Sequence, residues 1–271
     1  MNSPKEVAQN YVQIGVGKTK LSVGRMLVLG ILAGMFIALA GVGATVASAS
    51  IATASVAKLV GALVFPTGLA MVLIAGSELF TGNNLLIIPL LQKEVTIGGV
   101  LKNWFFVYVG NLLGSILVAA LVVYGHTTSL FGNAVAVSVI NTAIGKVTLT
   151  FVDALLRGIL CNFLVCIAVW MAFAAKDVVG KIAGLFLPIM LFVLSGYEHS
   201  VANMYYVSAG IFATGNDAYL SALPAGANTA ALTWVNMFVK NLLPVTLGNM
   251  IGGVCLVGVG YWFIYLKGDK K

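Results

Sequence analysis

The sequence predicts an all-α integral membrane protein with six transmembrane helices, built as two inverted repeats of three helices in which helices two and five are broken. Composition is the first reason, because 60% of the 271 residues are hydrophobic, 8% are charged and the mean hydropathy is +1.04. The second reason is the presence of six apolar runs, each with about the 20 residues that a membrane span needs. The third is a glycine followed by a carboxylate inside two of those runs, where a lipid-spanning helix should carry neither.

The N-terminal segment, residues 1–25, is predicted to be a cytoplasmic amphipathic tail that precedes the first span. Val7, Tyr11 and Ile14 recur at helical spacing, which is typical of a helix that lies along a membrane surface. The segment lacks the continuous apolar stretch of a secretory signal, so no signal peptide is expected. Residues 1–271 are predicted to form a single membrane domain.

The six apolar runs define the order of the spans. They cover residues 26–49, 59–91, 104–124, 151–175, 182–213 and 237–266. The second and fifth runs are too long to be single straight spans, and each is interrupted by glycine and glutamate, at 76–81 and at 196–200. The first repeat is predicted at 26–124, an outer loop at 125–150, the second repeat at 151–266 and a cytoplasmic tail at 267–271.

The basic residues predict the orientation. Of the 15 Lys and Arg residues, 11 fall on one side of the membrane when the N-terminus is cytoplasmic, since Lys58, Lys146 and Lys240 fall on the other side and Arg157 lies within the fourth span. The positive-inside rule therefore places both termini in the cytoplasm. The net charge of +7 is mostly this topological signal, and no basic cluster remains that would predict nucleic-acid binding.

A sequence duplication relates the two halves. Four residues of the third span recur 138 positions later in the sixth span, where Asn103, Gly110, Asn111 and Gly114 become Asn241, Gly248, Asn249 and Gly252. The triplet Gly-Ile-Leu at 30–32 recurs at 158–160. The glycines have the spacing that lets helix backbones approach closely. Because each half holds three spans, the halves must be inverted, and such repeats place substrate sites at their interface near the membrane midplane.

Three ionisable residues lie at the predicted breaks. Glu78 and Glu198 are expected to accept the backbone N–H groups that a break leaves unpaired, with influence on the protonation of His199 as the alternative for Glu198. His199 is the only histidine within a predicted span. Because imidazole titrates near neutrality, His199 is expected to take part in function, and a structural hydrogen-bonding role is the alternative.

Other polar residues in or near the spans are further candidates. Thr81 offers a hydroxyl just past the first break. Asn162 and Asn249 could bridge helices or line a pore, and the sequence leaves both open. Lys146, at the outer mouth of span four, has no acidic neighbour closer in sequence than Asp153, and could attract anions or anchor the helix. The three cysteines are expected to be buried thiols, and neither a metal nor another cofactor is expected.

Two segments resemble the signature segments of the formate–nitrite transporter family: Ala-Gly-Ser-Glu-Leu-Phe-Thr-Gly at 75–82 and Gly-Ile-Leu-Cys-Asn-Phe-Leu-Val-Cys-Ile-Ala at 158–168. The resemblance covers essentially the whole chain and is closest to the hydrosulfide-channel branch. Glu78, where formate and nitrite members more often carry Asp, and the Gly-Asn-Asn run at 82–84 depart from the family's pattern. The resemblance implies an aquaporin-like fold, a homopentamer with one pore through each protomer, and a bacterial cytoplasmic membrane as the location.

The resemblance also implies the residues of the pore. The family's central histidine falls on His199, its loop threonine on Thr81 and its vestibule lysine on Lys146. Its pore asparagines fall on Asn162 and Asn249. Its apolar constrictions fall on Phe65, Leu69, Leu79, Phe80, Val165 and Phe192.

We therefore expect a channel for small monovalent weak-acid anions, with hydrosulfide as the substrate and formate or nitrite as alternatives. His199 would aid passage by hydrogen bonding or by proton transfer, because a neutral acid crosses an apolar ring at a much lower desolvation cost than its anion. A different class of membrane protein, an aquaporin-like facilitator of neutral solutes, is the alternative to an anion channel, although the sequence lacks the Asn-Pro-Ala pair of aquaporins. An enzyme is not expected, because the sequence holds neither a Gly-x-Ser-x-Gly nor a His-Glu-x-x-His motif.

Overall fold

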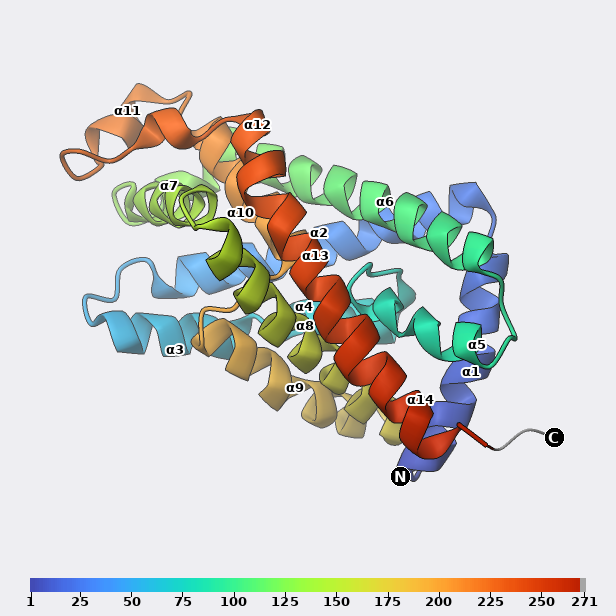
Figure 1. The fold of residues 1–271 in the computed structure, drawn as a ribbon. Helices are drawn as coiled ribbons and strands as arrows, with labels where there is room; N and C mark the ends of the chain where they lie inside the picture. The colour runs from blue at the N-terminus through green and yellow to red at the C-terminus, as the bar shows by residue number, and fades with distance from the viewer. Residues whose placement is uncertain (269–271) are drawn as a thin grey trace.

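The structure, a computed structural model, describes residues 1–268, so the last three residues of the predicted tail at 267–271 lie outside it. Every regular element in this part of the chain is a helix, and it contains no strand. The first half contains α1 (Pro4–Lys20), α2 (Val23–Ser48), α3 (Ala54–Val64), α4 (Thr67–Met71), η1 (Val72–Gly76), η2 (Gly82–Leu86), α5 (Ile87–Leu91) and α6 (Ile97–Tyr124). In Figure 1 the elements α1 and α5 lie at one end of the molecule.

The second half begins with a short turn, η3 (Thr127–Ser129), and ends beside the N-terminal helix. It contains α7 (Ala134–Val147), α8 (Phe151–Ala174), α9 (Val178–Leu194), α10 (Ser200–Ala213), α11 (Asp217–Ser221), η4 (Thr229–Ala231), α12 (Trp234–Asn236), η5 (Met237–Leu242), α13 (Leu243–Met250), η6 (Ile251–Val259) and α14 (Gly260–Tyr265). Figure 1 shows α7, α11 and α12 at the end of the molecule opposite α1, while α14 returns to α1.

Five helices in the described residues are long and apolar enough to cross a membrane. They are α2, the continuous helix formed by α3, α4 and η1 (Ala54–Gly76), α6, α8, and the continuous helix from α12 to α14 (Trp234–Tyr265). The fifth predicted run is divided into α9 and α10, each shorter than a span. The helix α6 begins earlier than predicted, because the Thr96 side chain accepts the Gly99 N–H and starts the helix in a stretch of low hydropathy.

The predicted outer loop at 125–150 is wrong in one respect, because it contains the helix α7. Val135, Val139, Ile140 and Ala143 recur on one face of α7, are buried, and lie on the side that packs against α10. A search for segments of span length overlooks an apolar stripe this short. The helix matters for the site because its last turn carries Lys146, which contacts Glu198 in the second break.

The N-terminal tail forms the predicted helix, but this helix packs against the protein and does not lie along a membrane surface as predicted. The helix α1 starts at a capping box, in which Ser3 and Glu6 exchange hydrogen bonds that hold the pKa of the Glu6 carboxyl below its usual range. Its apolar face is buried within the protein, with Val7 and Tyr11 at 0% and 1% exposure. The face packs on α5, α6 and α14 instead of a lipid surface.

Glycines bring the long helices into close contact, as the small-residue spacing predicted. A Cβ atom at Gly114 would collide with the Ile31 carbonyl of α2, and one at Gly252 would collide with the Ile159 carbonyl of α8. The backbones of α2 and α6, and of α8 and the C-terminal helix, are therefore in direct contact. These two tight pairs form the scaffold against which the broken helices are held.

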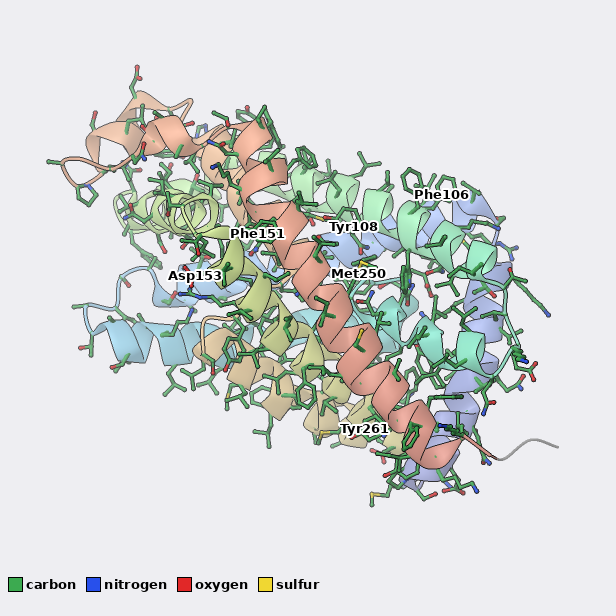
Figure 2. All side chains as sticks on the ribbon, viewed as in Figure 1. Phe106, Tyr108, Phe151, Asp153, Met250 and Tyr261 are labelled. Carbon is green, nitrogen blue, oxygen red and sulfur yellow. The ribbon has the colours of Figure 1, made fainter. Side chains whose placement is uncertain are left out.

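The outward faces of the long helices are apolar. On α6 the side chains of Phe105, Leu113 and Leu121 are 62%, 50% and 61% exposed. Figure 2 shows such side chains projecting from the outer faces of α6, α8 and the C-terminal helix. Apolar surface of this extent requires lipid or neighbouring subunits to cover it.

Candidate functional site

Each of the two broken helices ends at a glycine with a positive φ angle. The helix Ala54–Gly76 stops at Gly76, with φ +84°, and α9 is followed by Gly196, with φ +71°. Side chains disfavour this left-handed backbone conformation, which glycine adopts without strain. The chain then runs without regular structure at 77–81 and 197–199 before the next helix begins. The duplicated breaks predicted from the sequence are thus present.

An asparagine side chain holds each break. The Asn111 amide donates to the carbonyls of Gly30 and Glu78 at 2.8 and 2.9 Å, and its oxygen accepts the Phe80 N–H at 2.9 Å. Two of these partners, the Glu78 carbonyl and the Phe80 N–H, are backbone groups that the break would otherwise leave unpaired inside the protein, whereas Gly30 lies in the continuous helix α2. Asn111 therefore replaces part of the missing helical hydrogen bonding.

The same three bonds occur in the second half. The Asn249 amide donates to Gly158 and Glu198 carbonyls at 2.8 and 2.9 Å, and its oxygen accepts the Ser200 N–H at 2.9 Å. Asn162 donates to the Asn249 carbonyl at 2.7 Å and to the Asn84 side chain at 3.0 Å. Of the two possibilities that the sequence left open for Asn162 and Asn249, these contacts favour the helix bridge.

The two carboxylates do not accept the backbone N–H groups that the sequence led us to expect. Within the described residues, Glu78 accepts from Lys18 Nζ at 2.6 Å and from the Asn83 amide at 2.6 Å. Glu198 accepts from Lys146 Nζ at 2.7 Å and from the Asn203 amide. The freed N–H groups bond instead to asparagine side chains and neighbouring helix carbonyls, so each carboxylate remains available for a lysine.

Lys18 is a site residue that the sequence analysis missed. Like Lys146 it forms an ion pair with the glutamate of a break, and its carbonyl accepts from Asn103 as that of Lys146 accepts from Asn241. Lys18 and Lys146 are 128 positions apart, the same offset that relates the Gly-Ile-Leu triplets. That offset would have identified Lys18. The proximity of Lys146 to Glu198 also corrects the view of Lys146 as a cation without an acidic neighbour.

The Lys146–Glu198 ion pair predicts the effect of a charge reversal at Lys146. Lys146→Glu is expected to destabilise the protein by about 3–5 kcal/mol, because a buried ion pair that loses one partner leaves an uncompensated charge. The Glu198 side chain is only 4% exposed. Size-exclusion chromatography after heating would show this as a lower melting temperature. The double variant Lys146→Glu with Glu198→Lys should recover most of the loss, whereas wild-type melting of the single variant would show that the pair is not structural.

The two breaks meet at a hydrogen bond between His199 and Thr81. His199 Nε2 lies 2.9 Å from Thr81 Oγ1, and the residues are 3% and 0% exposed. His199 Nδ1 accepts the Ala202 N–H at 3.0 Å and so caps α10. Since Nδ1 is an acceptor, the proton of a neutral ring lies on Nε2 and is donated to Thr81. The Thr81 hydroxyl hydrogen is then free for another acceptor.

Two cavities approach this pair from opposite sides. The larger, here called the wide vestibule, has a volume of about 570 Å³ and is lined by Lys146, Glu198 and His199. The smaller, here called the narrow cavity, has a volume of about 30 Å³ and is lined by Lys18 and by Gly82, the neighbour of Thr81. The His199–Thr81 pair therefore lies between two cavities that each carry a lysine.

Apolar side chains close both cavities near the pair. Phe65 and Phe192 meet edge to face in the wide vestibule, with ring centroids 5.7 Å apart, and Phe192 stacks on the His199 ring. Leu69 and Leu79 line the narrow cavity. Of the six residues expected at constrictions, these four line one or the other cavity.

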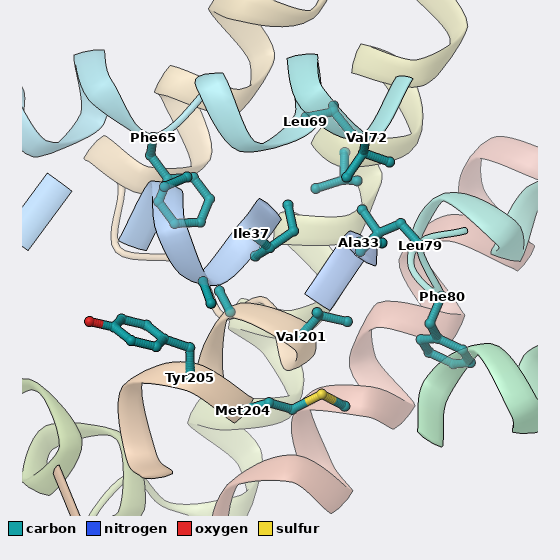
Figure 3. Close-up of a cluster of buried hydrophobic side chains, with 14 of the residues drawn as sticks. Ala33, Ile37, Phe65, Leu69, Val72, Leu79, Phe80, Val201, Met204 and Tyr205 are labelled. Carbon is teal, nitrogen blue, oxygen red and sulfur yellow. The ribbon is translucent and has the colours of Figure 1, made fainter. Parts of the chain in front are cut away.

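Phe80 and Val165, the other two expected constriction residues, line neither cavity. The Phe80 ring packs against Tyr108 and Trp104, with centroids 4.9 and 6.3 Å away. In Figure 3 Phe80 lies beyond Leu79, on the side away from Phe65 and Leu69. The Phe80 ring therefore packs on α6 and belongs to the scaffold, whereas the neighbouring Leu79 side chain lines the narrow cavity.

The cysteines correct a smaller expectation. Cys161 and Cys166 are buried, as predicted, but Cys255 is exposed. It lies on η6, in the C-terminal helix, among outward-facing residues such as Leu256. A free thiol there contacts the surroundings of the protein instead of its core.

A helical membrane protein in which two broken helices meet at a polar pair, between a cavity on each side, belongs to the class of channels and transporters. The sequence profile described as Formate/nitrite transporter matches residues 5–263. The chain belongs to the formate/nitrite transporter family.

Named relatives and solved structures agree with this membership. The chain is 41% identical to "Probable formate transporter" of Methanothermobacter thermautotrophicus, over 98% of this chain and 97% of that protein. It is 37% identical to "Formate channel FocA" of Escherichia coli strain K12, over 97% and 94%. The structure "Pentameric formate channel with formate bound" superposes with a TM-score of 0.80 at 36% identity, covering 90% of this chain and 98% of that one. "FNT family ion channel" superposes with a TM-score of 0.82 at 30% identity, covering 95% and 98%.

Proposed function

We propose that this protein is a channel for small monovalent weak-acid anions and that formate is its substrate. The observation that carries the proposal is the His199–Thr81 pair, held between two apolar closures and two lysine-bearing cavities. The relatives named above are a formate transporter and a formate channel, and they give no support to the hydrosulfide assignment expected from the sequence. Formate therefore replaces hydrosulfide as the proposed substrate.

We further propose six spans in two inverted halves, assembled as a homopentamer in the cytoplasmic membrane with both termini inside the cell. The matching contacts of Asn111 and Asn249 support the duplication. So does the 2.9 Å hydrogen bond between Tyr108 and Thr246, which are themselves 138 positions apart. The return of α14 to α1 supports a shared side for the termini (Figure 1). The proposed pentamer is supported by one solved relative, the pentameric formate channel named above.

In this mechanism Lys58 and Arg157, which line the wide vestibule and form no ion pair within the described residues, draw the anion in from that side, and the apolar closures set the barrier. A bare anion would lose several kcal/mol of solvation at the closures. The Thr81 hydroxyl offers it a hydrogen bond, and His199 Nε2–H reinforces that bond from behind. Because His199 Nδ1 already accepts the Ala202 N–H, His199 acts as a hydrogen-bond donor in this mechanism, and the proton that makes formate neutral comes from water in the cavity instead of a doubly protonated ring. The net positive charge of the wide vestibule favours an anion channel over a facilitator of neutral solutes.

Stopped-flow uptake into proteoliposomes tests the proposal. Formate, nitrite, hydrosulfide and nitrate are compared at several pH values, with protein-free liposomes as the blank. Formate uptake should exceed the blank and rise as pH falls, because the conjugate acid becomes more abundant. Nitrate, the anion of a strong acid, should pass slowly. Uptake of formate no faster than through protein-free liposomes would refute the channel, and hydrosulfide passing much faster than formate would restore the first assignment.

Widening the closure of the narrow cavity gives a separate prediction. Leu79→Ala is expected to raise formate uptake severalfold and to admit larger carboxylates such as acetate, because Leu79 lines that cavity. Phe80→Ala is the matched control, since its ring packs on Tyr108 outside both cavities. It should lower the melting temperature without raising uptake. The same uptake from both variants would show that Leu79 does not line the narrowest point.

A further inference from the structure

The cations that line the wide vestibule outnumber the carboxylates that could neutralise them. Three cations line it, Lys58, Lys146 and Arg157, and Glu198 is the one carboxylate among its lining residues. Lys146 is neutralised by Glu198 at 2.7 Å. The formal charge left facing the cavity is therefore two positive units, from Lys58 and Arg157.

No ion pair compensates Lys58 or Arg157 in the part of the chain that the structure describes. Asp153, one helical turn before Arg157 in α8 and labelled in Figure 2, instead accepts a hydrogen bond from the Thr150 hydroxyl at 2.7 Å. Lys58, Lys146, Arg157 and Glu198 all line one space. That space has a volume of about 570 Å³, enough for a small polyatomic anion with part of its hydration shell.

The vestibule also provides neutral hydrogen-bond donors and a closed floor. Ser138, Asn141 and Thr142 of α7 line the wall. The Phe65 and Phe192 rings meet below them, with centroids 5.7 Å apart. A single proton makes formate neutral, but it leaves a dianion with one charge, so a dianion still meets the full desolvation barrier at these rings. It can be held in the vestibule but cannot follow formate through.

We propose that the wide vestibule is a binding site for small dianions, of the class of sulfate and short dicarboxylates, and that an occupant blocks anion passage from that side. Lys58 and Arg157 supply the charge that selects a dianion over a monovalent anion. The blockage rests on the proposed channel function, whereas the binding itself does not.

Binding is tested by isothermal titration calorimetry on the detergent-solubilised protein. Malonate and sulfate are the probes, and methanesulfonate is the monovalent match to sulfate at equal ionic strength. Both dianions should bind, with methanesulfonate weaker by about tenfold or more, because a dianion gains about twice the Coulomb energy from the same cations. If malonate, sulfate and methanesulfonate bind the wild-type protein with equal affinity, or if malonate and sulfate give no heat of binding, the proposal is wrong.

Variants locate the site. Lys58→Met and Arg157→Gln should each weaken malonate binding about tenfold, as expected for a unit charge within about 5 Å of a dianion in a water-like dielectric. Lys240→Met is the matched control, because Lys240 is exposed next to Asn241, which contacts Lys146, yet it does not line the vestibule. An equal loss in Lys240→Met would show a general surface potential and contradict the site.

Flux measurements complete the test. Malonate on one side of the membrane should inhibit formate uptake, and malonate on the other side should not. Lys58→Met should raise the half-inhibitory concentration about tenfold, in step with its loss of affinity. Malonate binding without formate uptake would leave the site standing and refute the channel, whereas formate uptake with inhibition from both sides would refute the vestibule as the place of blockage.

Discussion

His199→Asn is expected to lower formate uptake about tenfold at every pH while leaving the shape of the pH profile unchanged. Asparagine can keep the cap on α10, because its side-chain oxygen accepts a backbone N–H as His199 Nδ1 does. It is too short to replace the 2.9 Å contact from Nε2 to Thr81. The loss of one buried hydrogen-bond partner corresponds to about 1–3 kcal/mol, which is tenfold or more in rate. Stopped-flow uptake from pH 5 to 8, read beside membrane current, provides the measurement.

Thr81→Val provides the matched control for the His199 variant. Valine has the shape of threonine without the hydroxyl, so uptake should fall by a similar factor. Because the two residues act as one unit, the double variant should lose little more than either single variant. If His199→Asn abolishes the pH dependence of uptake or converts it into a current, proton transfer at His199 is part of transport and the hydrogen-bond mechanism is wrong.

Asn249→Ala is expected to have the largest effect on stability. It removes a side chain that satisfies two buried backbone groups of the break, the Glu198 carbonyl and the Ser200 N–H, and that also bonds to the Gly158 carbonyl of α8. An unsatisfied buried polar group costs about 1–3 kcal/mol, so the loss should be about 3 kcal/mol or more. The assembled protein should be greatly reduced, as judged by size-exclusion chromatography of solubilised membranes.

A variant of nearly the same size separates hydrogen bonding from packing at this position. Asn249→Asp keeps the volume but replaces the two amide donors with an acceptor facing the Gly158 and Glu198 carbonyls, so it should be at least as harmful. Asn10→Ala, on the exposed face of α1, should be neutral. If Asn249→Asp assembles and melts like the wild type, the amide is not what holds the second break.

Much of the fold was predictable because its signals are local. The apolar runs, the glycine and glutamate of each break, and the offset of 138 between Asn111 and Asn249 all lie within short stretches of sequence. Hydropathy over about 20 residues reflects the bilayer thickness and so identifies spans directly. Polar residues at such depth are rare enough that His199, Thr81 and Glu198 stood out as site candidates.

Contacts that join distant segments were decided by the tertiary structure alone. The partner of Glu78 is Lys18, 60 positions earlier, and that of Glu198 is Lys146, 52 positions earlier. No sequence periodicity relates residues across such separations. The direction of the Phe80 side chain was not predictable either, because residues in a helix break do not follow helical geometry. The sequence by itself therefore determined a membrane protein with two polar interruptions and named most of the residues at them. Only the packing of α1 and α7 over the breaks decided which charges are paired and which face a cavity.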